Sequence, residues 1–260
     1  MSDALRYEWM RIRTLRSTYW LTGLGILITA GIAFIVAMVT RNDPTTPVIV
    51  ANVLLGGGEF ATFIPVLMAI MGVLAVGHEY RYGTIQPTLA AVPQRSRLLT
   101  AKIVVVALVA LIVVAVSLAI NTAIGVIFWG ELPDLATEPL DEVIPGYFVM
   151  VLLWAILGIA LAQLFRGVPS AIVVLLVTPL IVEGLITGLS TIPALDWLVP
   201  VVKFLPFTAG ARLIATGTTD MGPGAPDFDF FDRWQSGGVF AVFTAIILAV
   251  AWYRFQTRDA

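Results

Sequence analysis

Residues 19–38 read YWLTGLGILITAGIAFIVAM and contain no charged side chain. This stretch decides the fold class, because about 20 residues of helix at ~1.5 Å each reach ~30 Å, the thickness of the hydrocarbon core of a bilayer. The apolar region of a secretory signal peptide would be shorter, at roughly 7–15 residues, and would end at a small-residue cleavage site. We therefore expect a transmembrane helix here and no cleavable signal peptide.

The rest of the chain contains five further apolar runs. In lipid each must be helical, because every backbone N–H and C=O group needs a partner within the protein. A transmembrane β-barrel would instead show segments of alternating polarity, and these runs are continuously apolar. The sequence therefore predicts an all-α integral membrane protein with six transmembrane helices. The expected spans are Tyr19–Val39, Phe60–Gly77, Ile103–Phe128, Tyr147–Phe165, Val168–Leu189 and Gly238–Trp252.

A short break separates the fourth expected span from the fifth. Gly167 and Pro169 both disfavour a continuous helix, and Arg166 places a charge beside them. One long buried helix through this region is the alternative interpretation, and the break argues against it.

The composition agrees with a membrane protein and excludes several classes of function. Hydrophobic residues make up 59% of the chain and charged residues only 12%, about half the charged share of a soluble domain. The net charge of −2 gives no general attraction to nucleic acid. Cysteine is absent, which rules out disulfides and thiolate chemistry. The 260 residues are enough for a single membrane domain, 1–260, but not for an ATPase domain in addition.

The distribution of basic residues predicts the orientation. With the N-terminus in the cytoplasm, eleven of the fifteen Lys and Arg residues fall in cytoplasmic segments, as the positive-inside rule requires. The opposite orientation reverses the count. We therefore expect both termini in the cytoplasm. The four basic residues left outside are Arg41, Lys203, Arg212 and Arg233.

Residues 3–17 form an amphipathic pattern before the first span. On a helical wheel Leu5, Trp9, Ile12 and Leu15 share one face, and most of the rest is polar or basic. This pattern is typical of a helix that lies in the membrane interface with its cations near anionic headgroups. A lever between cytoplasm and membrane and a simple positive-inside anchor remain equally open. The residues singled out here are Trp9, Arg11, Arg13 and Arg16.

A compact loop joins the second and third spans. Residues 78–102 read HEYRYGTIQPTLAAVPQRSRLLTAK. Within it, Thr84–Ala91 is expected to form a short helix that presents Ile85 and Leu89, spaced i and i+4, to a partner. The alternative is a solvated connector without a partner.

The longest loop, 190–237, is expected outside and is not uniformly polar. Ile192–Leu205 and Phe207–Ile214 are largely apolar but too short to span a bilayer, which is typical of re-entrant or interfacial helices. Asp220–Asp232 is rich in Gly, Pro and Asp and is expected to be an exposed loop.

Motifs for catalysis are not found. No Gly-rich loop of the form G-x-x-x-x-G-K-[ST] is present, so the chain is not expected to bind ATP. The single histidine, His78, rules out H-E-x-x-H zinc chemistry and leaves a Ser-His-Asp triad without its G-x-S-x-G elbow. We expect neither an enzyme nor a metal or cofactor site.

One charged residue falls well inside an expected span. Glu183 lies in the outer half of the fifth span, where charges are costly and commonly functional. It is interpreted either as a carboxylate lining a path or gate, or as an outer-leaflet partner of Lys203 or Arg212. Asn121 and Gln163 are expected to make hydrogen bonds between helices. A single Glu and the lack of an internal repeat argue against an ion-coupled secondary transporter.

Two stretches carry a resemblance to a known family. Residues 8–20 read EWMRIRTLRSTYW, and residues 79–89 read EYRYGTIQPTL, with Pro93, Arg95, Arg97 and Lys102 following. These resemble the ABC type-2 permeases, the membrane subunits of ATP-binding-cassette exporters, and most closely the small six-helix permeases of actinobacteria. A weaker match is Leu205-Pro206-Phe207. The order of spans agrees along the whole chain.

The resemblance implies a function and a set of partners. It implies the permease of an ATP-driven exporter in a bacterial plasma membrane, moving a hydrophobic or amphiphilic substrate such as a drug, antibiotic peptide or lipid. Two copies of a separate ATPase subunit would bind ATP and Mg and join a permease homodimer or a heterodimer with a sister permease. The alternative is a membrane anchor or immunity-type subunit that binds a partner without transport.

The resemblance also implies roles for particular residues. The first cytoplasmic loop would contain the coupling helix that docks on the ATPase, and residues 3–17 would be the elbow helix beside it. Spans two and five would flank the substrate path, where Phe63, Met68 and Glu183 are the expected path or gate residues. The expected ATPase-coupling residues are Glu79, Tyr80, Arg81, Gly83, Thr84, Gln86, Pro87, Leu89, Arg95 and Arg97.

Overall fold

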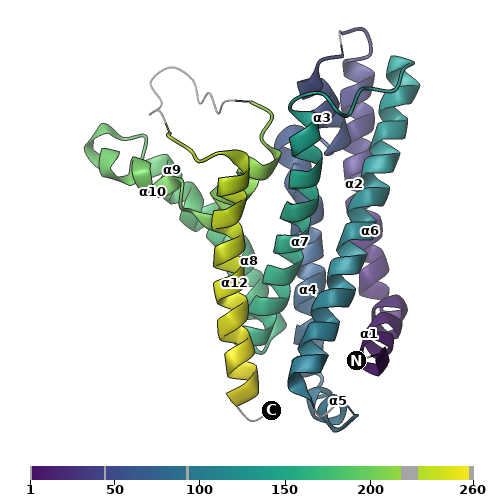
Figure 1. Cartoon of the computed structure of the whole chain (residues 1–260), viewed down its shortest axis with the longest axis vertical. Helices are drawn as coiled ribbons and strands as arrows, with labels where there is room; N and C mark the ends of the chain where they lie inside the picture. The colour runs from purple at the N-terminus through teal and green to yellow at the C-terminus, as the bar shows by residue number, and fades with distance from the viewer. Residues whose placement is uncertain (1, 44, 92–93, 218–227, 258–260) are drawn as a thin grey trace.

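The computed structural model describes residues 2–43, 45–91, 94–217 and 228–257, and in these ranges the secondary structure is helical and contains no strand (Figure 1). Within these described ranges six helices are long and apolar enough to cross a membrane, and the bent pair 193–202 and 206–214 would be a seventh if it formed one span. By length and composition the six long helices confirm the predicted number. They are α2 (Arg16–Val39), α4 (Phe63–Arg81), α6 (Arg95–Trp129), α7 (Leu140–Phe165), the stretch Val168–Leu189, and α12 (Arg233–Thr257).

Several of these helices extend well past the expected spans. Hydropathy marks only the apolar part of a helix, whereas the helix continues until its backbone is capped. α6 therefore begins at Arg95 instead of Ile103, and its first two turns carry Arg97 and Lys102.

Shorter helices connect the long ones. At the N-terminus α1 (Ser2–Thr14) precedes α2, and α5 (Ile85–Ala91) joins α4 to α6. α3 (Pro47–Leu54) was not predicted; the Thr46 side chain caps its N-terminus by accepting a hydrogen bond from the N–H of Ile49 at 3.4 Å. The remaining short elements are η1 (Gly58–Thr62), η3 (Pro193–Leu198), α10 (Val199–Val202), α11 (Pro206–Ala211) and η4 (Arg212–Ile214).

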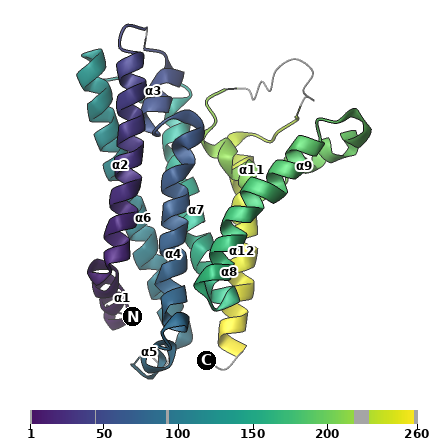
Figure 2. The same cartoon turned by 180° about the vertical axis from the view of Figure 1, so that it is seen from behind.

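α4 and α7 form the centre of the bundle, with α2 and α6 paired on one side and α12 packed against α7 on the other (Figure 2). α4 and α7 approach closely because glycines lie at their crossing. A Cβ atom on Gly158 would collide with the carbonyl oxygen of Ala69, and one on Gly72 would collide with that of Ala155. Small residues at a crossing allow this close backbone contact.

The two polar residues expected to join helices do so. The side-chain amide of Asn121 on α6 donates to the carbonyl oxygen of Leu54 on α3 at 2.8 Å. Gln163 on α7 donates to the hydroxyl of Tyr80 on α4 at 2.6 Å. These predictions are confirmed.

The fifth long helix differs from the others in shape and burial. It consists of α8 (Val168–Val177), the π-helix η2 (Thr178–Glu183) and α9 (Gly184–Leu189). Its α9 end points away from the rest of the bundle (Figure 2). Only 11% of the residues in its most apolar stretch are buried, against 61% in the corresponding stretch of α4. The predicted break before it is present, since Arg166 ends α7 in the left-handed region with φ 53° and Gly167 is extended.

The two ends of the bundle carry different short elements. α1, α5 and the C-terminal end of α12 lie at one end, which we call the terminal side, and α3, α9 and α10 lie at the other end, the far side (Figure 1). On the far side the predicted short helices are present as a pair, 193–202 and 206–214, bent by 63°. Of the expected exposed loop Asp220–Asp232, residues 220–227 lie outside the described residues.

Candidate functional site

Four charged side chains from three separate segments meet on the terminal side. Lys102 Nζ of α6 lies 2.7 Å from Glu8 Oε1 of α1 and 2.7 Å from Glu79 Oε1 of α4. A guanidinium nitrogen of Arg11 lies 2.6 Å from the same Glu79 oxygen and 3.4 Å from Glu8 Oε2. Lys102 also donates to the carbonyl oxygen of Ala75 at 3.3 Å. We call Glu8, Arg11, Glu79 and Lys102 the ion cluster.

The ion cluster is buried and formally neutral. Glu8, Glu79 and Lys102 are 0%, 1% and 2% exposed, and two carboxylates face two cations. Charges are this deeply buried only when they are paired and hydrogen-bonded. Removing one member would leave another charge buried without compensation, so the cluster fixes α1 against the ends of α4 and α6.

The buried face of α1 agrees with the predicted one only in part, since Ile12 belongs to both. Ala4, Glu8 and Ile12 are its most buried residues, one helical turn apart, whereas the expected apolar residues Leu5 and Trp9 are only partly buried. Glu8 falls between Ile12 and Leu15 on a helical wheel, but it was not predicted to be buried, because a hydrophobicity pattern has no signal for a carboxylate that is neutralised by distant residues.

The predicted loop 78–102 overlaps the C-terminal turn of α4, which ends at Arg81. Glu79, Tyr80 and Arg81 form the last turn of α4, and the N–H of Thr84 donates to the carbonyl oxygen of Glu79 at 2.9 Å. Gly83 has φ +66°, a conformation that L side chains rarely adopt. This glycine lets the chain turn from α4 into α5.

α5 turns its apolar side inward. Ile85 is 7% exposed and belongs to the main core, and Leu89 packs against that core. The prediction that Ile85 is presented to a partner is therefore wrong, because the chain buries this residue itself, whereas Leu89 is only partly buried and its predicted role stays untested. The outward surface of this region consists of Arg81, Tyr82, Gly83, Thr84, Gln86 and Pro87, which we call the α5 surface.

The other expected coupling residues divide between exposed and structural positions. Arg97 is exposed. Arg95 donates to the carbonyl oxygen of Phe255 at 2.9 Å and so ties α6 to the end of α12. Tyr80 is held by Gln163, and the Arg166 guanidinium lies 6.0 Å from its ring centre. Pro93 lies outside the described residues.

A second cluster surrounds Glu183 on the far-side half of the fifth helix. Glu183 is buried at the end of η2. Its Oε1 accepts from the N–H of Phe207 at 3.0 Å, and its Oε2 accepts from the N–H of Thr208 at 2.7 Å and from the Thr208 hydroxyl at 2.8 Å. The carboxylate therefore anchors the first turn of α11 to the fifth helix. We call this arrangement the Glu183 latch.

The partners expected for Glu183 lie elsewhere. Lys203 Nζ lies 3.3 Å from Asp229 Oδ2, and the Arg212 guanidinium lies 4.6 Å from the ring centre of Phe230. Backbone amides take the place of these cations around Glu183, an arrangement that residue types alone do not reveal.

The Glu183 latch borders a cavity of about 380 Å³ between α4, α7, the fifth helix and α11. Phe63 and Glu183 both line it, together with Trp154 and Phe207, whose ring centres are 4.9 Å apart. Met68 is completely buried and is not among the lining residues. Two of the three expected path residues thus share one cavity. A neighbouring cavity of about 530 Å³ shares Thr62, Thr208 and Ala211 with it.

The described residues contain no group of three His, Cys, Asp or Glu side chains that could hold a metal ion.

Comparison with known protein families gives one match. No curated protein matches the chain. Residues 59–260, well over half of the chain, match a family described as "Protein of unknown function (DUF2705)". The match includes α5, Glu79, Lys102 and Glu183, and it begins after α1. The chain therefore belongs to the DUF2705 family.

Proposed function

We propose that this chain is the membrane subunit of an ATP-driven exporter of the ABC type-2 class, inserted in a bacterial plasma membrane with six spans and cytoplasmic termini. The support is the resemblance of residues 8–20 and 79–89 to that family and the excess of basic residues on the terminal side. The six apolar helices and the position of α1 and of the end of α12 on the same side are compatible with this topology.

The observation that carries the proposal is the ion cluster. α5 joins α4 to α6, and the cluster connects the end of α4, the start of α6 and α1 through buried charges. A partner that pushes on the α5 surface would therefore move three helices together instead of bending a loop. Such a rigid connection is what an energy-coupling element needs, since it must bias a two-state membrane domain.

The remaining parts of the proposal follow from the chemistry that the chain lacks. No ATP-binding loop is found in the sequence, so ATP and Mg would bind to a separate subunit, present in two copies beside two permease chains. The partner permease is either a second copy or a sister chain.

The cavity at the Glu183 latch favours a permease over a non-transporting anchor. Its wall is mostly aliphatic and aromatic, with one carboxylate and two threonine side chains. This lining suits a hydrophobic or amphiphilic substrate. An anchor or immunity-type subunit would use its α5 surface for binding and would need no such cavity.

Co-purification tests the proposal. The full-length chain, tagged at its C-terminus and expressed in its native host, should recover a Walker-motif ATPase. Gln86→Trp places bulk on the α5 surface and should abolish this recovery. Gln235→Trp, at an exposed position on the far side, is the matched control and should recover the ATPase normally.

Two results would contradict the proposal. One is that no ATPase is recovered with the wild-type chain. The other is that Gln86→Trp, with an unchanged melting temperature, recovers the ATPase as well as Gln235→Trp does. Substrate export that is lost on deleting the chain then separates the permease from the anchor.

A further inference from the structure

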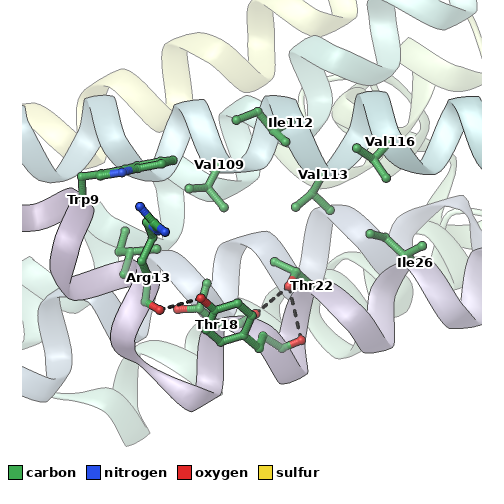
Figure 3. Close-up of a pocket in the computed structure, with 11 residues that line it drawn as sticks. Trp9, Arg13, Thr18, Thr22, Ile26, Val109, Ile112, Val113 and Val116 are labelled. Atoms are coloured by element: carbon green, nitrogen blue, oxygen red, sulfur yellow. Dashed lines mark hydrogen bonds between the residues drawn. The ribbon is translucent and has the colours of Figure 1, made fainter.

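A groove lies between α6 and the junction of α1 with α2, on the terminal side (Figure 3). Its volume is about 250 Å³. It lies apart from the α5 surface and from the cavity at the Glu183 latch. None of the expected path residues lines it.

One wall of the groove is a strip of branched aliphatic side chains. Val109, Ile112, Val113 and Val116 follow one face of α6 at the i, i+3, i+4, i+7 spacing, and Ile26 of α2 lies opposite (Figure 3). Along a helix this strip is ~10 Å long. Ile112 and Val116 are 47% and 42% exposed, so the strip is open to an apolar occupant. Water would find few hydrogen-bond partners there.

The α1 end of the groove has a different chemistry. Trp9 and Arg13 both lie there, at the end of the aliphatic strip (Figure 3). Tyr19 donates to the carbonyl oxygen of Arg13 at 2.7 Å, which fixes the turn from α1 into α2. Arg13 is exposed and makes no ion pair within the described part of the chain, in contrast to Arg11 two residues earlier. Arg6 and Arg16 are also exposed nearby in the sequence.

We propose that this groove binds one anionic phospholipid from the leaflet that faces the terminal side. The phosphate contacts the Arg13 guanidinium, which can donate two parallel hydrogen bonds to it. One acyl chain lies along the α6 strip, and the Trp9 indole lies at the boundary between them, where amphipathic rings are favoured. Charge complementarity selects an anionic headgroup, and the aliphatic wall selects a lipid over free phosphate.

This site is more specific than a general attraction of basic residues to a membrane, and it has a mechanical consequence. The residues that line the groove include Ile12 of α1, and the same helix carries Glu8 and Arg11 into the ion cluster. A bound lipid therefore stabilises the position of α1 against α6. The inference requires membrane insertion, as the proposed function does, but it does not require an ATPase partner.

Native mass spectrometry of the purified full-length chain tests the site. The protein is extracted in mild detergent and titrated with phosphatidylglycerol or phosphatidylcholine of equal chain length. The wild type should retain one phosphatidylglycerol in preference to phosphatidylcholine. Arg13→Gln should weaken this binding about fivefold, because one basic residue contributes about 1 kcal/mol of binding free energy at an anionic lipid surface. Arg41→Gln, an exposed arginine on the far side, is the matched control and should bind as the wild type does.

A second variant acts on the acyl chain alone. Ile112→Trp fills the groove without changing charge, and it should remove the bound phosphatidylglycerol even if Arg13→Gln proves difficult to express. Millimolar inorganic phosphate should not displace the lipid.

Three outcomes would overturn the inference. Equal retention of both lipids would mean an occupant without headgroup recognition, and displacement by inorganic phosphate would mean a simple anion site. Unchanged lipid binding in Ile112→Trp, with loss of a dimer seen in the wild type, would assign the groove to a second copy of the chain. Lipid retention is measured without any ATPase, so failure here and failure of the proposed function are distinguishable.

Discussion

The ion cluster and the Glu183 latch both bury carboxylates among apolar helices, but they neutralise them differently. In the ion cluster, side-chain cations from α1 and α6 compensate Glu8 and Glu79. In the latch, two backbone N–H groups and one hydroxyl of a single short segment hold Glu183.

This difference bears on what each region can do. Charged side chains from segments far apart in the sequence tie whole helices together, and losing one of them leaves an unpaired charge. Backbone donors tie one local segment to one helix, and losing the carboxylate leaves only unsatisfied amides. We therefore expect the ion cluster to govern the stability of the bundle and the latch to govern one cavity wall.

Lys102→Met gives the largest expected effect and tests the first half of this comparison. Two buried carboxylates would face only Arg11, which should destabilise the protein by about 3–5 kcal/mol. The melting temperature in detergent measures it. Adding Glu79→Gln leaves Glu8 and Arg11 as a neutral pair and should restore part of the loss.

Lys203→Met is the matched control for this variant. Lys203 pairs with Asp229, whose side chain is 96% exposed, so its removal should cost less than about 1 kcal/mol. Equal losses in the two lysine variants, or a double variant less stable than Lys102→Met alone, would show that charge balance does not hold α1 in place.

Gly158→Ala tests whether the ion cluster and the cavity at the Glu183 latch both depend on the close contact between α4 and α7. α4 carries Glu79 near one end and Phe63 at the other, and its contact with α7 has no space for a Cβ at Gly158. Overpacking should cost about 2–3 kcal/mol. Gly31→Ala on α2, where no atom lies within 4 Å of the added Cβ, should be neutral or slightly stabilising, since alanine favours helix. A tolerated Gly158→Ala would contradict the close crossing.

Glu183→Gln tests the second half of the comparison. One carboxamide oxygen cannot replace two carboxylate oxygens, so at least one amide of Phe207 or Thr208 loses its acceptor, at a cost of about 1–2 kcal/mol. On the proposed function, substrate binding in the cavity should also weaken, while ATPase recovery should be unchanged. Glu142→Gln is the control. The Glu142 side chain pairs with Arg233 but is 52% exposed, so this variant should change the stability by less than about 1 kcal/mol. Loss of ATPase recovery in Glu183→Gln would contradict this separation, because the latch would then affect the α5 surface at the other end of the bundle.

The sequence predicted the long helices well and the polar contacts unevenly. Hydropathy identifies a span such as 103–128 because lipid excludes charge over its whole length, and Gly167 with Pro169 predicted the break before the fifth helix by backbone chemistry alone. Asn121 and Gln163 were also predicted correctly, since an amide among apolar helices must find a partner.

The two clusters were not predictable in the same way. Each depends on which distant segments meet: Glu8 with Lys102, and Glu183 with the amides of Phe207 and Thr208. A residue's own neighbours in the sequence contain no signal for such a meeting. The inward turn of Ile85 was missed for the same reason, because an apolar i, i+4 pair looks identical whether it packs on its own chain or on a partner.

Gly83→Ala has the smallest expected effect on stability and separates strain from function. Gly83 has φ +66° with no atom within 4 Å of an added Cβ, and Gly130, at the end of α6, has φ +76° with equally open space. Each alanine variant should therefore cost about 1 kcal/mol from backbone conformation alone. Only Gly83 lies on the α5 surface, so only Gly83→Ala should lower ATPase recovery and substrate-stimulated ATPase activity. Because the two variants carry the same strain, an equal loss of activity in both would trace the defect to stability, and an equal absence of loss would exclude the α5 surface as the place where a partner acts.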